Sequence, residues 1–238
     1  MKNKYLINNT LALVCARGGS KGLKGKNYIQ IKKKPLIFYA IDKILKNKLK
    51  FNCLSTDSKK IMQISKKLGL KSFFIRPKNL SSSNVSKFNV WQHALEEAEK
   101  YYKKKFKYLL DVEVTNPLTT TNDLAKFLKK FNRIKNIYDG MFCVRDSLKN
   151  PHFNILIRKN NRFYTSIEGD KKIVSRQKAR KTYDHIAAMY MFNTNFIKRS
   201  NHLLDGKIAP YNLPLEKSFD IDDKEDFNLV KKIMENKC

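Results

Sequence analysis

Cysteine is scarce in this sequence, and no two cysteines have the spacing of a metal-binding or redox motif. The four, Cys15, Cys53, Cys143 and Cys238, are far apart, and three of them lie in apolar, strand-like runs. We therefore interpret them as reduced thiols that behave as small hydrophobic side chains, which argues against a zinc site and against disulfides.

Long apolar runs are also missing. No run approaches the roughly 20 residues that a membrane-spanning helix needs. The basic start, MKNKYLINNT, has neither the apolar stretch nor the cleavage site of a signal peptide. We expect a soluble, cytoplasmic protein with no membrane partner. With 238 residues and no internal repeat or linker, the chain is expected to form a single domain over 1–238.

Acidic residues are few: 21 Asp and Glu stand against 50 Lys and Arg, which gives a formal net charge of +29. Such an excess attracts anions and is common among nucleic-acid-binding proteins. Here, however, the basic residues are scattered over the whole chain, and several predicted helices carry them opposite an apolar stripe. We interpret them as solvated faces, and we expect a smaller anionic ligand in place of nucleic acid.

The order of the predicted elements indicates an α/β fold. Strands are predicted over 11–16, 49–56, 71–75, 106–114 and 140–144, and helical stripes follow Pro35 and Ser58 and cover 88–102 and 121–134. Strands that alternate with helices predict a mostly parallel sheet with helices on both faces. Around Lys159, Asn160 and Asn161 two alternating runs predict a hairpin arm at about 151–183.

One stretch, ARGGSKGLKGKN (16–27), concentrates glycine and positive charge directly after the apolar run LALVCA. In open α/β sheets, ligands bind beyond the carboxyl ends of the strands. Glycines let backbone N–H groups approach a phosphate, Arg17 offers a planar fork, and Lys21 a compact charge. The stretch matches neither the P-loop nor G-x-G-x-x-G. By themselves these residues leave two readings open, a polyphosphate cradle and a solvated basic loop.

Several short motifs in a fixed order are more specific than this one stretch. After ARGGSKG…KN come KPLIFYAIDKILKN, STDSKKIMQISKKLG, RPKNLSS, TNPL, SRQ with Tyr183, and EKSFDIDDKEDF. From about residue 11 to 234 the chain resembles the CMP-sugar synthetases, the cytidylyltransferase family that activates sialic-type acids. The resemblance implies a Rossmann-like nucleotidyltransferase fold. It also implies transfer of CMP from CTP to the anomeric hydroxyl of a nine-carbon 2-keto-3-deoxy sugar acid, with release of pyrophosphate.

The same resemblance implies a nucleotide site. Arg17 and Lys21 would hold the triphosphate and carry catalysis, with Lys21 stabilising the leaving pyrophosphate. The positions that match nucleotide contacts are Arg17, Gly18, Gly19, Ser20, Lys21, Lys26, Asn27, Arg76 and Ser86.

A metal site and a sugar site follow in the same way. Asp220 and Asp222 match the metal-binding pair, with Asp111 as a further candidate, and oxygen ligands shared with phosphates imply Mg²⁺. We expect both acids on an extended strand, where alternate side chains share one face. For the sugar acid the matching positions are Glu113, Arg176, Gln177 and Tyr183. A homodimer joined through the arm is also implied, since a lone hairpin cannot bury its apolar face.

The sequence departs from the family pattern at four positions. Serine stands at 83 in place of aspartate, lysine at 87 in place of serine, threonine at 119 in place of arginine, and isoleucine at 186 in place of asparagine. Most of these lie on the sugar side, so neuraminate, legionaminate, pseudaminate and another ulosonate all stay open. So do a related nucleotidyltransferase with another substrate, a nucleotide-binding member without turnover, and a basic nucleic-acid-binding protein. No general base is assigned, although His185 lies near the sugar segment.

Overall fold

A six-stranded sheet organises the chain in the computed structural model, which describes residues 2–20, 22–167, 175 and 178–236. Its strand order is β10-β6-β9-β5-β1-β4. The strands are β1 (Thr10–Cys15), β4 (Asn52–Ser55), β5 (Tyr108–Val112), β6 (Gly140–Asp146), β9 (Tyr183–Asn193) and β10 (Ile208–Asn212). Neighbours are parallel except around β9, which runs antiparallel to both β5 and β6. The prediction of a mostly parallel sheet is confirmed.

Helices cover both faces of the sheet, as expected from the apolar run of β1. Ala12 and Val14 of β1 pack in one core cluster, whereas Leu11 and Leu13 pack in the other. The first cluster includes residues from α1 (Lys2–Asn8), α2 (Leu36–Lys46), α3 (Lys59–Lys67), α5 (Thr121–Ile134) and α7 (Lys224–Glu235). The second includes residues from α4 (Lys87–Tyr102) and α6 (Thr194–Arg199). The short strands β2 (Gln30–Ile31) and β3 (Lys34–Pro35) pair just before α2.

The predicted strand over 71–75 is wrong, because this segment is irregular in the structure. Two backbone hydrogen bonds tie it to the neighbourhood of β4: Leu54 donates to Lys71 (2.9 Å) and Arg76 donates to Thr56 (2.7 Å). Its apolar composition reflects packing of Phe73 and Phe74 against the second core cluster. Periodicity alone does not distinguish such a packed extended segment from a ladder strand.

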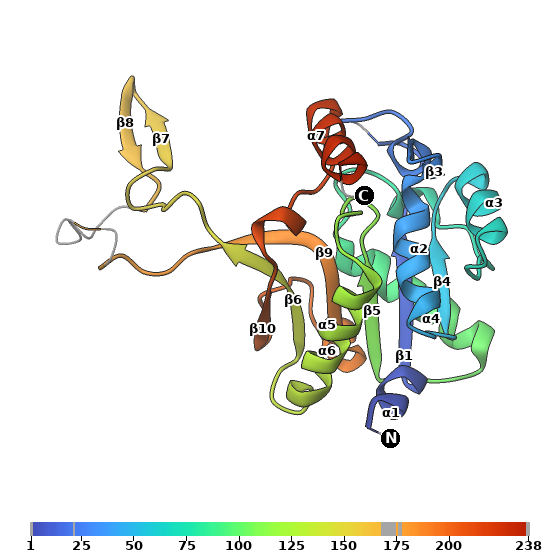
Figure 1. The fold of residues 1–238 in the computed structure, drawn as a ribbon. Coiled ribbons are helices and arrows are strands. Elements are labelled where there is room, and N and C mark those ends of the chain that lie inside the picture. Colours follow the sequence, from blue (N-terminus) through green and yellow to red (C-terminus); the bar gives the residue numbers. More distant parts are fainter. Residues whose placement is uncertain (1, 21, 168–174, 176–177, 237–238) are drawn as a thin grey trace.

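The predicted hairpin is present and stands away from the sheet (Figure 1). It consists of β7 (Leu156–Lys159) and β8 (Arg162–Thr165), which pair antiparallel. Asn160 and Asn161 join the strands with φ values of 49° and 59°. Positive φ at both central residues is the geometry of a type I′ turn, which asparagine tolerates well.

Candidate active site

Two cavities open around the loop that leaves β1 at its carboxyl end. One of about 370 Å³ is lined by Cys15, Arg17, Ser20, Gly22, Lys26, Asn27, Thr115 and Asp222. The other, of about 300 Å³, is lined by Cys15, Arg17, Arg76, Leu80, Ser82, Ser83, Val85, Lys87, Val90 and Glu113. Because Cys15 and Arg17 line both, we describe the two together as the cleft. It lies beyond the carboxyl ends of the parallel strands, where open α/β sheets bind their ligands.

A larger cavity, of about 650 Å³, lies at the other end of the strands, beside the start of β5 and the end of β9. Its acidic side chains are already paired with bases: Glu99 with Lys105 (2.7 Å) and Asp139 with Arg199 (2.9 Å). None of the residues that the motifs indicate lines it. Volume therefore does not identify the functional site here.

The glycine-rich loop is held in place by hydrogen bonds to its backbone. The Asp57 carboxylate accepts the N–H of Gly18 (2.7 Å), and the Asn27 side-chain amide donates to the carbonyl of Arg17 (2.7 Å). Gly22 packs so closely that a Cβ there would lie 2.3 Å from the carbonyl oxygen of Asp222. Only glycine permits this approach. The peptide unit between Arg17 and Gly18 is thus held on both its N–H and its carbonyl side, and Gly22 packs against the acidic segment.

The acidic segment before α7 reaches the same cleft from the far end of the sequence. Ile221 donates its N–H to Thr115 (2.9 Å), and the Lys26 ammonium contacts the carbonyl of Ile221 (2.7 Å) and the carboxylate of Asp222 (3.1 Å). In Figure 1, α7 accordingly lies near the loop between β1 and α2. The segment is a loop in the structure, so the predicted strand here is wrong.

Asp220 and Asp222 form an acid pair that the ammonium of Lys26, 3.1 Å from the Asp222 carboxylate, compensates only in part. Asp220 is half-buried, and burial together with the charges of Asp222 and Asp226 raises the pKa of its carboxyl. The side chain of Asp222 is 77% exposed toward the cleft. Two carboxylates that repel one another beside a ligand cavity suit a hard cation, which would relieve that repulsion. In the part of the chain that the structure describes, no three acidic, histidine or cysteine side chains gather as a self-sufficient metal site.

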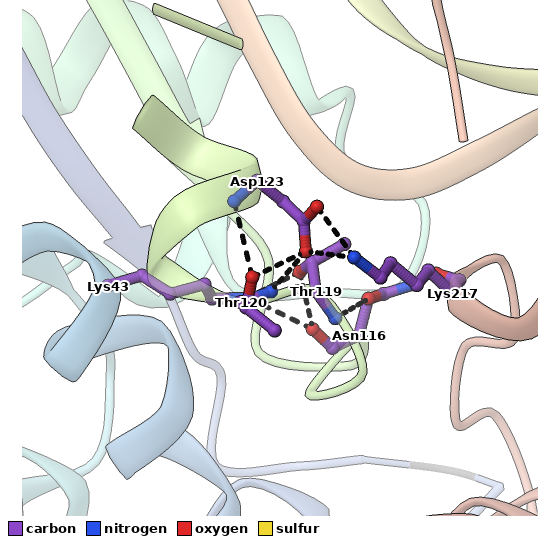
Figure 2. Close-up of polar contacts among 6 residues, drawn as sticks. All are labelled: Lys43, Asn116, Thr119, Thr120, Asp123 and Lys217. Carbon is purple, nitrogen blue, oxygen red and sulfur yellow. Dashed lines mark hydrogen bonds and ion pairs between the residues drawn. The ribbon is translucent and has the colours of Figure 1, made fainter. Parts of the chain in front are cut away.

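A polar network anchors the acidic segment to the turn after β5 (Figure 2). The Asn116 side-chain amide donates to the carbonyls of Lys217 (2.9 Å) and Phe219 (3.3 Å). The Lys217 ammonium in turn bonds both carboxylate oxygens of Asp123 at the start of α5 (2.7 and 2.9 Å). Asp220 therefore follows directly on backbone that is fixed from two sides.

Lys43 of α2 completes this network from the core. Its ammonium donates to the carbonyl of Asn116 (3.0 Å) and to the hydroxyl of Thr119 (2.7 Å), and only 2% of the residue is exposed. Thr119 is the position where the family pattern has arginine, and here α2 supplies the positive charge at that hydroxyl instead. Burial lowers the pKa of Lys43 to about 8.

The lowered pKa predicts a pH dependence of stability that Lys43→Met should remove. Between pH 8 and the ordinary lysine value of 10.5, the unfolded chain binds the Lys43 proton more tightly than the folded one. The free energy of unfolding of the wild type should therefore rise across this window, by about 3 kcal/mol relative to Lys43→Met. Urea unfolding at both pH values measures the difference.

The matched control is Lys46→Met on the same helix, where the lysine side chain is 63% exposed. Its stability should follow the wild type in parallel across the window. If Lys43→Met also runs parallel, the buried ammonium titrates as in water and the pKa assigned to it is wrong.

The other residues that were predicted to contact the nucleotide differ in whether they line the cleft. Arg76 lines the cleft while its guanidinium bonds the hydroxyl (2.9 Å) and carbonyl (2.6 Å) of Ser55 at the end of β4. Gly19 is exposed with open space where a side chain would lie. Ser86 caps α4 by accepting the N–H of Phe88 (3.2 Å) and does not line either cavity.

On the proposed sugar side, Glu113 lines the cleft, whereas Tyr183 is exposed at the start of β9 and lines neither cavity. His185 packs edge-on against Phe142 (4.8 Å) and Tyr190 (5.4 Å), and burial lowers its pKa. Lys21, Arg176 and Gln177 lie outside the described residues, so their roles stay predictions.

Asp111, the further metal candidate, is fully buried and lines neither half of the cleft. Its carboxylate accepts the indole N–H of Trp91 (2.7 Å) and pairs with the ammonium of Lys87 (3.1 Å), which also pairs with Glu113. The ammonium of Lys87 thus already pairs with the Asp111 carboxylate, which the resemblance offers as a further metal ligand.

A family model described as cytidylyltransferase matches residues 11–238. The chain belongs to the cytidylyltransferase family. The resemblance drawn from the motifs is confirmed.

Two curated relatives of this cytidylyltransferase align along nearly their whole length, and a third is about twice as long. The "Post-translational flagellin modification protein B" of Campylobacter coli is 31% identical over 232 residues, 97% of each chain. The "CMP-N,N'-diacetyllegionaminic acid synthase" of Campylobacter jejuni is 32% identical over 221 residues, 92% of each chain. The "N-acylneuraminate cytidylyltransferase" of Escherichia coli is 26% identical, and the match spans 52% of that longer protein.

Solved structures confirm the nucleotidyltransferase fold of this cytidylyltransferase. A CMP:2-keto-3-deoxy-manno-octonic acid synthetase complexed with CTP superposes with a TM-score of 0.66, at 14% identity over 97% of this chain and all of that one. A 4-diphosphocytidyl-2C-methyl-D-erythritol synthase from Anaerococcus prevotii gives 0.64 at 11% identity. Across the described ranges, no helix combines the length and the apolar character that a bilayer span requires.

Proposed function

We propose that this cytidylyltransferase transfers CMP from CTP to the anomeric hydroxyl of a sialic-type, 2-keto-3-deoxy nonulosonic sugar acid and releases pyrophosphate. The observation that carries the proposal is the shared cleft: Arg17 of the glycine-rich loop and Asp222 from the far end of the chain line one cavity. The names of the relatives supply the substrate class. The proposal places the protein in the cytoplasm, where CTP is available.

In this reaction the protein mainly positions groups and neutralises charge. Arg17, which lines both halves of the cleft, would meet the triphosphate, and Asp57 and Asn27 already hold the peptide unit between Arg17 and Gly18 in place. Glu113, in the other half of the cleft, offers oxygens to sugar hydroxyls. In this proposal the anomeric hydroxyl attacks the α-phosphorus, and pyrophosphate leaves on the Arg17 side.

Mg²⁺ is the proposed cofactor, and Asp220 and Asp222 are the residues that would hold it. Magnesium is commonly bound through one or two carboxylates, with water and substrate phosphates completing its six ligands. Asp222 lines the cleft and Asp220 is close enough for their charges to interact, which fits that pattern. When bound, the ion supplies positive charge to the phosphate oxygens. Lys26, already in contact with Asp222, holds that carboxylate at the cleft.

The experiment that tests this function incubates the protein with MgCl₂, each of the four nucleoside triphosphates and a panel of sugar acids. The panel contains N-acetylneuraminate, legionaminate, pseudaminate and 3-deoxy-manno-octulosonate, and mass spectrometry identifies the product. We expect a CMP-sugar from CTP and a nine-carbon acid. A product formed only from another nucleotide, or only from the eight-carbon acid, contradicts the proposal.

We also propose that two copies associate through the hairpin arm. Ile157 is 52% and Phe163 67% exposed on the two paired strands, and an isolated two-stranded hairpin is marginal in water without a covering surface. Phe163→Glu should convert a dimer into a monomer in sedimentation velocity. Leu204→Glu changes a side chain that is 68% exposed outside the arm and should leave the dimer intact. A monomeric wild type at micromolar concentration rules the arm out as a stable dimer contact.

A further inference from the structure

Lys87, the first residue of α4, extends its ammonium into a cluster of acids and aromatic rings at the cleft. The nitrogen lies 3.1 Å from Asp111 Oδ2 and also pairs with Glu113. It stands 4.5 Å from the ring centre of Tyr190 and 5.5 Å from that of Trp91. The lysine side chain remains 34% exposed and lines the cleft, so the charge sits between the buried acid and the ligand cavity.

Asp111 needs a cation at this place. The residue is fully buried, and its Oδ1 has no hydrogen-bond partner among the described residues, while Oδ2 accepts the indole N–H of Trp91. Glu113 follows two residues later at the end of β5, so its carboxylate meets the same ammonium. A buried carboxylate beside a second one is costly unless a positive charge compensates both. Two such carboxylates are also the kind of ligand that a divalent cation takes.

We propose that Lys87 is a built-in cation that occupies, between Asp111 and Glu113, the place that a divalent cation would otherwise take. The inference rests on the proposed function in that the cleft binds a nucleoside triphosphate with Mg²⁺. Lys87 then leaves the divalent requirement to Asp220 and Asp222, and it adds its charge to those of Arg17 and Arg76 along the cleft wall. Without it, two bare carboxylates face the polyanionic substrate.

Terbium luminescence tests the vacated site without any turnover. Trp91 is the single tryptophan of the chain, and its indole nitrogen lies 2.7 Å from Asp111 Oδ2. Terbium bound between Asp111 and Glu113 is therefore sensitised when tryptophan is excited.

Lys87→Ala should give about tenfold brighter, saturable emission than the wild type, and Lys87→Ala with Glu113→Gln should lose that gain. Lys100→Ala, which removes an exposed lysine from the same helix, should match the wild type. Equal emission from Lys87→Ala and wild type overturns the proposal.

Steady-state kinetics provides a second readout that separates a built-in cation from a structural role. Loss of one charge-assisted contact corresponds to about a tenfold change, so both Lys87→Ala and Lys87→Met should raise the KM for CTP about tenfold at low Mg²⁺. High Mg²⁺ should restore much of the loss in Lys87→Ala, where a cation can enter, and little in Lys87→Met, where the side chain fills the space. Identical Mg²⁺ curves for the two variants overturn the inference. A wild type that makes no CMP-sugar defeats the proposed function and leaves the terbium result standing.

Discussion

Asp222→Asn should lower the turnover number by on the order of a hundredfold and raise the half-saturating Mg²⁺ concentration about tenfold. The magnitude is that expected when one of the two carboxylates that would hold the charge-neutralising Mg²⁺ is lost. Asp222 lines the cleft together with Arg17. Its charge helps raise the pKa of Asp220, so the two carboxylates are close enough to bind one cation together. Initial rates over a Mg²⁺ series measure both effects.

The matched control for this variant is one residue away. Asp223→Asn makes the same chemical change, but the Asp223 carboxylate caps α7 by accepting the N–H groups of Glu225 (2.8 Å) and Asp226 (2.9 Å). Asparagine is an equally good cap, so stability and activity should both stay near the wild type. If the two variants show the same Mg²⁺ curve, Asp222 is not a metal ligand and the acidic segment serves only to begin α7.

Much of the fold could be predicted from local sequence because its main elements carry strong periodicity. The capping box of Thr120 and Asp123 starts α5 at Thr121, and the helix spans the predicted residues. The position of β9 between β5 and β6 could not be predicted, since strand order depends on contacts distant in sequence. β10 contains Pro210 and lies at an edge of the sheet, where proline is tolerated. A proline in a short run argues against a strand, which is why this one was missed.

In the site, sequence reasoning found the residues that follow a recognisable motif and missed those that act through the fold. Asp57 directly precedes Ser58, which caps α3, but the Asp57 carboxylate itself accepts the N–H of Gly18, 39 residues away in the sequence. Lys43 is given no role from the sequence, although it follows Leu36 and Ala40 at helical spacing and is buried. A lysine on the apolar stripe was the available signal for it. The pairing of Lys87 with Asp111 could not be predicted from the sequence, where the one sign of it is that lysine replaces the serine of the family pattern at position 87.

Lys21→Ala should reduce the turnover number about a thousandfold while leaving the free energy of unfolding within about 0.5 kcal/mol of the wild type. The role assigned to Lys21 comes from the motif ARGGSKG, and its sequence neighbours Ser20 and Gly22 both line the cleft. A positive charge that meets the departing pyrophosphate acts mainly in the transition state. The loss should therefore fall on kcat, with a smaller change in the KM for CTP.

Lys24 offers the control in the same loop, because it is exposed and lines neither half of the cleft. Lys24→Ala removes the same charge from the same glycine-rich segment, so any effect of net charge alone appears in both variants. A large fall in kcat for Lys21→Ala only, measured by pyrophosphate release at saturating CTP and sugar acid, assigns the effect to position. Equal and small effects would show that the loop attracts the triphosphate by its overall charge, and catalysis would then rest on Arg17 and the acid pair.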